Sequence, residues 1–505
     1  MMQIFLRSYG LMVLRSYGLT VLWSFLLCTI LPSFAQTDPP LRIELECAKD
    51  RQDYKFFSLE KQGVAVFYKS AALTADTAQW VFIQYDTNLI RTHLYKIKLP
   101  HQCQYFSADF SDNKLYLFLQ KPPQKKDKKD SLKNYLLEWN VTTSRFQLYD
   151  LQNYNSPFVS YIKVKDDFLF MVTDEQKNKS ITFYNYQTHA KQTFQVVDEE
   201  ITNIESFGID TLAKRTFFCM FLKNKKGTRA ELFITDYSGT IKERAVLPHY
   251  EDMVYNSAKI AIVGKDSLLF VGGFSNSKEK KPQGCYSGIF TMLFSKNRFS
   301  KRNSYPFGAL VAKDSVLKTK NLTESNLISH LHITQHNGKI FAISEYFYPQ
   351  YQYITSSYRN YGYYGYEPPT QTFSGFLFTN AYISEFNAQG LLLQEWYFPV
   401  LDVLTKSLYH LVDVYQDADN NSLFYYVYND NIVSQFIHGK QLLSPQTAIS
   451  IDLAHKTDML EYSSNVLMQH WYNNKFLLSG YQYIKNQQRG KGKRYVFFLN
   501  KMICE

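Results

Sequence analysis

A short turn signal followed at once by an uninterrupted apolar run recurs eight times along this chain of 505 residues. Asp112-Asn113-Lys114 precedes Leu115 to Leu119, for example, and Asn337-Gly338-Lys339 precedes Ile340 to Ile343. The turns lie near residues 63, 113, 167, 215, 266, 338, 421 and 474, so successive units are 50, 54, 48, 51, 72, 83 and 53 residues apart. Insertions account for the two long intervals. A period near 50 residues with short strands is typical of a β structure that repeats about an axis.

A second hairpin follows the apolar run in several units, as in Trp80 to Lys98 and Glu231 to Val246, so each unit supplies four antiparallel strands. The second strand is apolar on both faces, which requires cover on both sides. The 40 Tyr and 39 Phe also favour strands. We therefore predict an all-β protein, a single β-propeller of about eight four-stranded blades. Seven blades are the next choice, and two shorter propellers or stacked sandwiches are the runner-up architecture.

One short stretch of the sequence resembles a known repeat. Leu268 to Phe274, Leu-Leu-Phe-Val-Gly-Gly-Phe, is similar to the double-glycine phrase of kelch repeats, and the four-stranded unit resembles a generic propeller blade. The phrase occurs once and lacks the accompanying Trp, so the resemblance implies the propeller fold and no specific family. Helical spacing is confined to one short candidate helix, marked by Leu401, Leu404, Leu408 and Leu411.

The last unit supplies only three strands, and Leu41 to Cys47 is the candidate for its fourth. Pairing of this N-terminal strand with the last blade closes the ring. It also brings the two ends of the mature chain together, so we predict a disulfide between Cys47 and Cys504. Cys219 lies within Phe217 to Phe221 and is expected to be a buried thiol of the core.

Residues 1–35 are predicted to be a removable export leader. Two Arg and no acidic residue precede the apolar run Leu19 to Leu31, which is too short to span a bilayer, and a small-x-small site ends at Ala35. We expect cleavage after Ala35 and a propeller domain over 36–505, located in the periplasm or outside the cell, free or associated with the envelope. The alternative is an uncleaved N-terminal anchor. No later stretch reaches 18 apolar residues, so no other transmembrane span is expected.

Basic residues concentrate in one class of loop. The net charge of +11 becomes +9 without the two Arg of the leader. In a propeller, the connections between the second and third strands of every blade share one rim, and five of the eight connections expected there are rich in Lys or Arg. The basic binding candidates on this rim are Lys125, Lys126, Lys225, Lys226, Lys280 and Lys281.

The same connection in the sixth unit contains nine Tyr between residues 346 and 366. A loop rich in Tyr and Gly offers a large contact area on an adaptable backbone. Beside positive charge it suits a protein or glycan partner, anionic ones included, whereas nucleic acid is not expected for an exported protein. The alternative is that the Lys-rich loops are solvated hairpin ends and the Tyr tract is a tolerated insertion. The aromatic binding candidates are Tyr351, Tyr353, Tyr358, Tyr361, Tyr363, Tyr364 and Tyr366.

The sequence signals for a metal-binding or catalytic site are weaker than those for the fold and the basic rim. His330 and His332 are two residues apart on a predicted first strand, so they share a face near the axis, and His336 follows at the turn. Three imidazoles can bind a transition metal. No carboxylate or Cys stands at a supporting spacing, so we predict no metal site and interpret these residues as the polar lining of a wet channel.

First strands also place Asp109, Glu205, Asp413 and His470 near the axis, where glycosidase propellers keep their acids. The sequence contains no Gly-x-Ser-x-Gly, His-Glu-x-x-His, P-loop, Gly-x-Gly-x-x-Gly or paired Cys-x-x-Cys motif, and we expect no cofactor. We favour an exported, non-catalytic, monomeric propeller that binds a protein or glycan through the basic, Tyr-rich rim. The alternatives are a secreted carbohydrate-active enzyme that uses the axial acids and a structural component of the envelope.

Overall fold

The computed structural model describes residues 42–503 except 49–52, 75–76, 123–131, 152–153, 155–158, 176–177, 195, 197–198, 226, 278–285, 308–327, 355–369 and 487–491. Within these residues the elements are strands β1 to β35 and a single 3-10 turn, η1 (Glu60–Gln62). No helix in the described part of the chain is long and apolar enough to cross a membrane.

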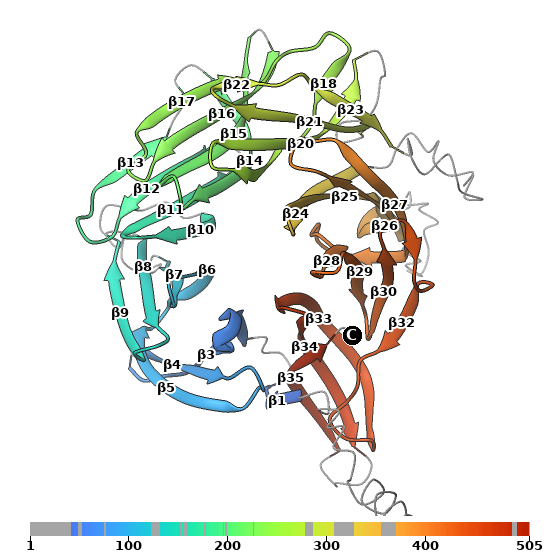
Figure 1. Cartoon of the computed structure of the whole chain (residues 1–505). Coiled ribbons are helices and arrows are strands. Elements are labelled where there is room, and N and C mark those ends of the chain that lie inside the picture. Colours follow the sequence, from blue (N-terminus) through green and yellow to red (C-terminus); the bar gives the residue numbers. More distant parts are fainter. Residues whose placement is uncertain are drawn as a thin grey trace, which may run out of the picture.

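The strands form eight antiparallel sheets arranged in a ring, which Figure 1 shows along its axis. We number these sheets as blades 1 to 8 in chain order and give their strands from the axis outward. Blades 1 to 4 have four strands each. Their bounds are β2 (Lys55–Ser58), β3 (Val64–Ala72), β4 (Thr77–Tyr85) and β5 (Arg91–Pro100); β6 (Gln104–Ser111), β7 (Lys114–Lys121), β8 (Lys133–Asn140) and β9 (Arg145–Asp150); β10 (Val159–Lys165), β11 (Phe168–Glu175), β12 (Asn178–Asn185) and β13 (Lys191–Phe194); β14 (Glu200–Asp210), β15 (Arg215–Asn224), β16 (Gly227–Asp236) and β17 (Ile241–Val246).

Blades 5 to 8 keep the same four positions, but some of these positions are shared by two short strands. In blade 5, β18 and β19 both pair with β20, and β22 and β23 both pair with β21, while in blade 7 β31 and β32 both pair with β30. The bounds are β18 (Met253–Tyr255), β19 (Lys259–Gly264), β20 (Ser267–Asn276), β21 (Gly288–Ser295), β22 (Arg298–Phe299) and β23 (Asn303–Pro306); β24 (Ile328–His336), β25 (Lys339–Ile354), β26 (Thr370–Phe386) and β27 (Leu392–Thr405); β28 (Asp413–Gln416), β29 (Asn421–Tyr428), β30 (Asn431–His438), β31 (Gln441–Leu442) and β32 (Thr447–Ser450); β33 (Asp458–Tyr472), β34 (Lys475–Asn486), β35 (Lys493–Ile503) and β1 (Arg42–Glu46). The prediction of a single propeller of eight four-stranded blades is confirmed.

The eight turn signals connect the first and second strands of the eight blades. Most of these turns contain a residue with positive φ, a conformation that Gly, Asn and Asp adopt at least cost. Asn337 (φ 49°) and Gly338 (φ 75°) form the two-residue turn of blade 6, and Asp112 and Asn113 do the same in blade 2. Such two-residue turns match the twist of the flanking strands and therefore fix the register of each inner hairpin.

Alternate residues of each second strand pack against opposite neighbouring blades. In β7, Leu115, Leu117 and Leu119 join the apolar cluster shared with blade 1, whereas Tyr116 and Phe118 join the cluster shared with blade 3. Such clusters lie between all successive pairs of blades, the last of them between blades 8 and 1. The uninterrupted apolar runs are therefore a consequence of cover on both faces. Cys219, in β15, is fully buried in one of these clusters, as expected.

The N-terminal strand closes the ring, as predicted. β1 pairs antiparallel with β35, with Arg42 opposite Asn500 and Glu46 opposite Val496, and so becomes the outer strand of blade 8. The Arg42 guanidinium donates to Gln482 Oε1 at 2.6 Å and to Asn500 Oδ1 at 3.3 Å. The first and last segments of the propeller are thereby joined in one sheet.

The predicted helix at Leu401 to Leu411 is wrong. Strand β27 continues to Thr405 and pairs Leu404 with Leu377 of β26. Leu401 and Leu408 are 64% and 42% exposed, whereas Leu411 is buried, so the spacing did not mark a single buried face. A spacing of three and four residues is a weak signal when tertiary pairing offers the same backbone a strand partner.

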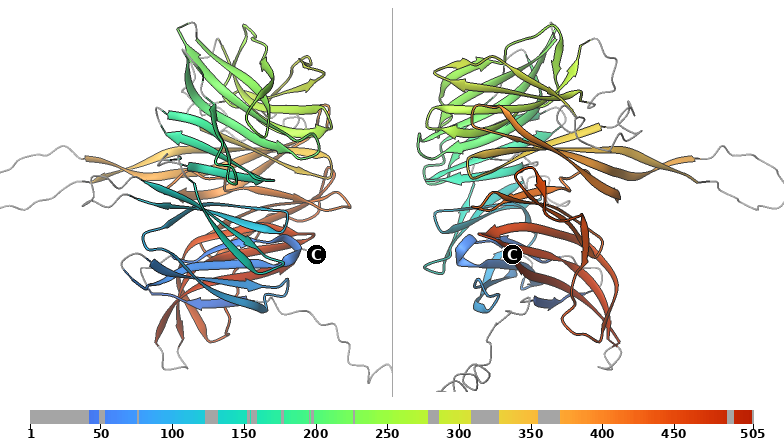
Figure 2. Two further views of the ribbon diagram at one scale, coloured as in Figure 1. Left: turned by 90° about the vertical axis from the view of Figure 1, so that its left-hand side faces the viewer. Right: turned by 45° about the vertical axis from the view of Figure 1, so that its right-hand side comes forward.

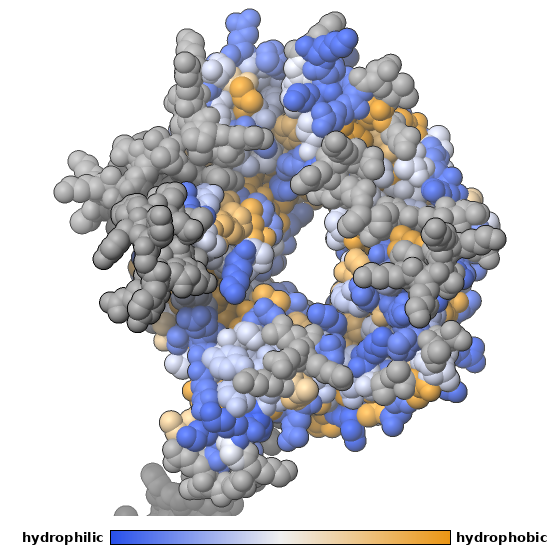
Figure 3. Space-filling model, turned by 180° about the vertical axis from the view of Figure 1, so that it is seen from behind, coloured by the Kyte–Doolittle hydropathy of each residue, from blue (hydrophilic) through white to orange (hydrophobic). Residues whose placement is uncertain are grey.

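Two features of the overall shape bear on function. The space-filling view in Figure 3 shows an opening through the centre of the ring. The hairpin of β25 and β26 is the longest in the described structure, with strands of 16 and 17 residues, and it projects well beyond the other blades in both views of Figure 2.

Candidate functional site

The projecting hairpin of blade 6 carries the described part of the predicted Tyr-rich surface. Tyr351 lies in β25 opposite Phe373 of β26, and its side chain is 47% exposed. Tyr353 lies further along the same strand, opposite Gln371. The other Tyr candidates lie outside the described residues: Tyr358, Tyr361, Tyr363, Tyr364 and Tyr366.

Among the basic candidates, Lys225 is exposed in the turn between β15 and β16. That turn joins the second and third strands of blade 4, as the β25–β26 connection does in blade 6, so the two share a rim of the propeller. The remaining basic candidates fall outside the part of the chain that the structure describes: Lys125, Lys126, Lys226, Lys280 and Lys281.

The start of the Tyr tract is strand rather than loop, which corrects the sequence-based boundary. β25 runs to Ile354 and pairs with β26 as far as Thr370. Tyr346 is buried and packs edge-on against Tyr382 with ring centroids 5.7 Å apart. Aromatic residues suit a paired strand, and irregularities of register at Tyr346/Phe347 and Gln350/Tyr351 let the long hairpin bend.

Aromatic side chains form a continuous series along this hairpin, from its exposed end into the core. The ring of Tyr351 lies 5.7 Å from that of Phe373, Phe373 lies 5.1 Å from Phe376, and Phe376 lies 5.5 Å from the buried Phe347. Each contact is edge-to-face, an arrangement that aromatic quadrupoles favour. The exposed pair Tyr351 and Phe373 is therefore held in place by the rings below it.

Exposed aliphatic side chains also occur on β27, the outer strand of blade 6. Leu404 is 37% exposed and pairs with Leu377, so it lies on the opposite face of the sheet from Phe376. Leu401 is 64% exposed. The aromatic surface of the hairpin is therefore formed by Tyr351 and Phe373, and exposed apolar side chains that lie together mark an interaction surface more often than scattered single residues do.

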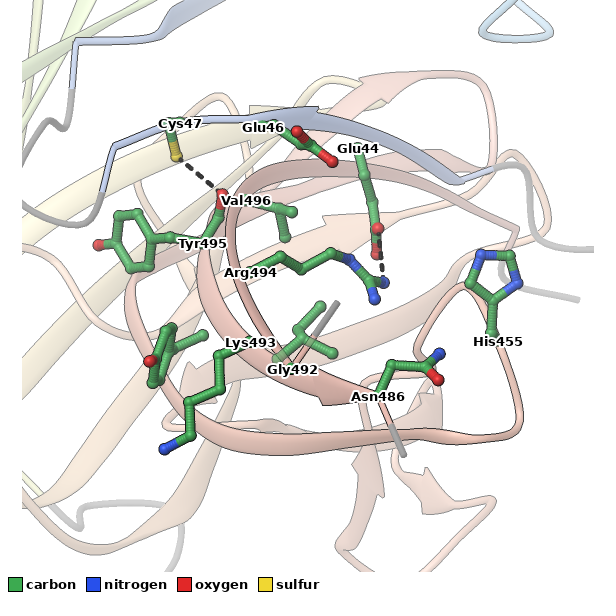
Figure 4. Close-up of a pocket in the computed structure, with 12 residues that line it drawn as sticks. Glu44, Glu46, Cys47, His455, Asn486, Gly492, Lys493, Arg494, Tyr495 and Val496 are labelled. Atoms are coloured by element: carbon green, nitrogen blue, oxygen red, sulfur yellow. Dashed lines mark hydrogen bonds and ion pairs between the residues drawn. The ribbon is translucent and has the colours of Figure 1, made fainter. Parts of the chain in front are cut away.

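A polar cavity of about 600 Å³ lies at the seam where β1 joins β35 (Figure 4). Arg494 dominates it and donates to Glu44 Oε2 of β1 at 2.9 Å and to Asp458 Oδ2 of β33 at 2.5 Å. Burial acts to raise the pKa of Asp458, but the hydrogen bonds from Arg494 and Asn486 and the charge of Arg494 together outweigh it, so the pKa lies below its usual value. Because these charges already neutralise one another, the cavity is best understood as part of the ring closure.

The predicted disulfide partner Cys504 lies outside the described residues, but the surroundings of Cys47 bear on it. Cys47 is a free thiol whose Sγ lies 3.5 Å from the carbonyl oxygen of Tyr495 (Figure 4). From Tyr495, β35 continues to Ile503, about 26 Å of extended strand further on. Disulfides need Cα atoms within about 7 Å. The antiparallel register therefore disfavours a bond between Cys47 and Cys504.

Two of the three axial acids expected from the sequence, Asp109 and Glu205, are paired with neighbouring blades. Asp109 binds Lys163 Nζ at 2.8 Å and accepts the amide of Val164 at 2.8 Å, and Lys259 binds Glu205 at 3.2 Å. Asp109 and Glu205 thus connect adjacent inner strands. His470 stacks on Tyr415, with ring centroids 4.6 Å apart, and its Nε2 lies 2.7 Å from the carbonyl oxygen of Asn473.

A different cluster forms where blades 6 and 7 meet at the axis. His330 and His332 of β24 both pack on His410, which precedes β28, with ring centroids 4.1 and 4.0 Å apart. Glu345 of β25 lies directly opposite His330 in the register. Its Oε1 accepts the amides of Leu411 and Val412 at 2.7 and 2.6 Å.

The second carboxylate oxygen of this cluster faces imidazoles. Glu345 Oε2 lies 3.5 Å from His410 Nδ1 and 3.9 Å from His332 Nδ1. Burial raises the pKa of Glu345 to about 8, against the opposing effect of the two amides. Burial lowers the pKa of His330 to about 4, with a further contribution from His410, and lowers that of His410 itself to about 4. Neutral imidazoles carry a free lone pair, which is the form that binds metals.

A cavity of about 250 Å³ adjoins the cluster. Its lining includes His332, His410, Asp413 and Tyr425. Asp413 accepts the phenol hydrogen of Tyr425 at 3.0 Å, and burial raises the pKa of Asp413 above its usual range. His336, the third imidazole considered from the sequence, is engaged elsewhere: its Nε2 lies 2.9 Å from the carbonyl oxygen of Val414.

Sequence reasoning missed Glu345 and His410 as partners of His330 and His332. A signal for Glu345 existed, because the Asn337-Gly338 turn fixes the hairpin register and places residue 345 opposite residue 330. No such signal existed for His410. It belongs to the next blade and follows the long β26–β27 hairpin, so only the packing of blade 7 on blade 6 brings it to the cluster.

No family model and no curated protein matches this chain. Among solved structures, a polysaccharide lyase, Uly1, aligns at 8% identity and a TM-score of 0.41 over 92% of this chain and 100% of that one. A putative 6-phosphogluconolactonase from Bacteroides uniformis aligns at 8% and 0.38 over 77% and 96%. An α-L-arabinofuranosidase from Clostridium thermocellum aligns at 9% and 0.27 over 59% and 94%. These likenesses carry no inference about ligand or activity, and the fold rests on the strand pairing itself.

Proposed function

We propose that this protein is an exported binding propeller that engages a partner through the hairpin of blade 6. We call this surface the arm and define it as 348–354 of β25 and 370–376 of β26. The observation that carries the proposal is the exposed pair Tyr351 and Phe373, held 5.7 Å apart on strands that project from the ring. Tyr and Phe are enriched in the buried centres of protein interfaces.

A protein partner is favoured over a glycan by the apolar character of this blade. Leu401 and Leu404 of β27 add exposed aliphatic side chains, with Leu404 on the opposite face of the sheet from Phe376, and aliphatic side chains pack well against apolar protein surface. Sugars bind chiefly by aromatic stacking together with hydrogen bonds from polar groups. The exposed Lys225 on the same rim would contribute attraction to an anionic region of the partner.

A carbohydrate-active enzyme that uses the axial acids Asp109 and Glu205 has less support. Lys163 lies 2.8 Å from Asp109, and Lys259 lies 3.2 Å from Glu205, so both carboxylates serve as links between inner strands. A general acid and base pair needs two carboxyl groups free to face a substrate. These ion pairs support a binding role over hydrolysis at these positions.

Export is part of the proposal and rests on the leader-like N-terminus. We expect the leader to be removed after Ala35, which leaves Gln36 as the first residue. N-terminal sequencing of the protein recovered from the periplasm or the medium tests this. Recovery of the intact N-terminus in a membrane fraction would instead support the uncleaved anchor.

The binding role is tested with the double variant Tyr351→Ala/Phe373→Ala. Each ring, if it is an anchor, contributes about 1–2 kcal/mol, so the double change weakens partner binding by at least about 30-fold. Partner proteins captured by the exported chain from the envelope fraction are quantified by mass spectrometry for wild type and variant, and a glycan array is probed in parallel. The matched control is Phe106→Ala, because Phe106 is 40% exposed on β6 of blade 2, away from the arm.

We expect a specific protein to be lost with the arm variant and retained with the control, at unchanged melting temperature. Binding to the array that depends on the same two rings would identify a glycan as the partner instead. Equal capture by wild type and the arm variant would refute the proposed surface.

A further inference from the structure

Side chains from three separate segments converge on one point between blades 6 and 7. His330 comes from β24, Glu345 from β25 and His410 from the connection before β28, and one donor atom from each lies within 4.8 Å of the other two. We propose that these three residues, with His332 as a fourth donor, bind a divalent transition-metal ion. This inference goes beyond the proposed partner binding and does not depend on it.

The main support for a metal site is a set of buried polar atoms that have no hydrogen-bond partner among the described residues. Glu345 is fully buried, its Oε1 is satisfied by two amides, and its Oε2 has no hydrogen-bond partner among the described residues. The Nδ1 atoms of His330 and His332 are likewise buried without a partner in the described part of the chain. Each such atom costs about 1–3 kcal/mol when left unsatisfied. A single cation placed among them would satisfy all three.

The geometry is close to what a metal requires. In a tetrahedral site with bonds of 2.0–2.1 Å, the donor atoms stand about 3.4 Å apart. Glu345 Oε2 lies 3.5 Å from His410 Nδ1 and 3.9 Å from His332 Nδ1. One donor atom from each of His330, Glu345 and His410 lies within 4.8 Å of the other two, and the stacked rings of His330 and His410 must turn out of their parallel arrangement for both lone pairs to face one ion. Three nitrogen donors and one carboxylate favour zinc and related first-row ions over Ca²⁺ or Mg²⁺, which prefer oxygen donors.

The carboxylate is also held in the manner of a metal ligand. The amides of Leu411 and Val412 fix Glu345 Oε1, which turns Oε2 toward the imidazoles. Because His410 directly precedes Leu411, the same segment positions both ligands. Hydrogen bonds that orient a ligand in this way are a regular part of metal sites. Access is available through His410, whose side chain is 43% exposed beside the 250 Å³ cavity.

The simplest alternative is an apo cluster in which a protonated Glu345 donates to His410. The experiment that separates the two uses the purified exported chain, stripped with a chelator, incubated with Zn²⁺ and dialysed, and its bound metal is then measured by mass spectrometry. Replacement of Zn²⁺ by Co²⁺ gives visible absorption bands that report the donor geometry. We expect one ion per chain and the bands of a four-coordinate nitrogen and oxygen site.

The variants Glu345→Gln and His410→Ala are each expected to weaken Zn²⁺ binding by at least about 100-fold. In Glu345→Gln the side-chain carbonyl oxygen can still accept the two amides, and His410 is partly exposed, so both variants should fold. The control is His438→Ala, an exposed imidazole on β30 that lies 2.8 Å from Asn421. Failure of the wild-type chain to retain Zn²⁺, or equal retention by both cluster variants and the control, would overturn the proposal.

Discussion

The sharpest stability prediction concerns Arg494, which ties the N-terminal strand to the last blade. Its Nη1 and Nη2 donate to Asp458 at 3.1 and 2.5 Å, and Nη2 also reaches Glu44 of β1 at 2.9 Å. The Asp458 side chain is fully buried. Replacing Arg494 with Met keeps much of the aliphatic length of the side chain but removes both ion pairs at once.

The cost can be worked out group by group. Glu44 keeps its ion pair with Arg42, which lies 2.8 Å away, so losing the contact with Arg494 costs Glu44 little free energy. Asp458 keeps the amide of Asn486, at 2.6 Å, but loses the cation that neutralises its buried charge. Removing one partner of a buried pair costs about 3–5 kcal/mol, and the neighbouring cavity admits water, so we take the lower end, about 3 kcal/mol. Over the roughly 390 residues that the structure describes, this lowers the melting temperature by about 4 °C.

The same energy governs local separation of β33 from β35 at this end of blade 8. We expect the amides of 458–460 and 493–496 to exchange hydrogen for deuterium about 100-fold faster in the Arg494→Met variant at pH 7, because their separation no longer has to break the Arg494–Asp458 pair. Arg298→Met, at an exposed position of β22, is the control and should leave this exchange unchanged.

The pH dependence follows from the lowered pKa of Asp458. A carboxyl whose pKa is depressed in the folded state stabilises the protein above its unfolded pKa, about 3.9, and this contribution is lost as the pH falls through the folded value. The difference between wild type and variant should therefore be constant from about pH 5 to 8 and shrink below about pH 4. Equal exchange at pH 7, or a difference that is undiminished at pH 3, would refute this reasoning.

Two further predictions concern a turn and a thiol. Gly390 has φ +76°, its carbonyl accepts Thr291 Oγ1 of blade 5 at 2.6 Å, and an added Cβ would lie 2.8 Å from that oxygen. Gly390→Ala should lower the melting temperature more than Gly439→Ala, where φ is +55° but the space is open, and equal shifts in calorimetry would contradict the packing argument. Burial raises the pKa of Cys47 to about 11. Alkylation of the native protein at Cys47 should therefore be slow at pH 8 and accelerate with pH, and mass spectrometry that finds Cys47 in a disulfide would contradict this.

The repeat, the blade number and the ring closure could be predicted because each has a local cause. A turn such as Asn337-Gly338 requires residues that tolerate positive φ, and a strand covered on both faces requires a run such as Leu115 to Leu119. The last unit contains only three strands in the sequence, so the need for a fourth strand from the N-terminus could likewise be predicted. The prediction of a helix at Leu401 to Leu411 was wrong, because these residues do not share one buried face: Leu401 and Leu404 are exposed at the end of a strand, whereas Leu411 is buried.

The binding surface was only partly within reach of the sequence. The Tyr tract is evident from the composition. The point at which its paired strand ends, Ile354, depends on the pairing of Ile354 with Thr370, which the composition does not specify. Likewise, the exposed aromatic pair becomes a candidate anchor only because Phe373 lies opposite Tyr351 on a strand that begins after the tract.

The sequence by itself determined what is local and periodic: strands, turns, their count and the identity of the strand that closes the ring. Only the tertiary structure decided which side chains meet across blades. His410 reaches His330 and Glu345 from another blade, 80 residues from His330 in the chain, and Cys47 lies beside Tyr495 rather than near the end of β35. The physical reason is that a turn fixes register within a hairpin, whereas contacts between blades depend on how whole sheets pack, a property that no short stretch of residues encodes.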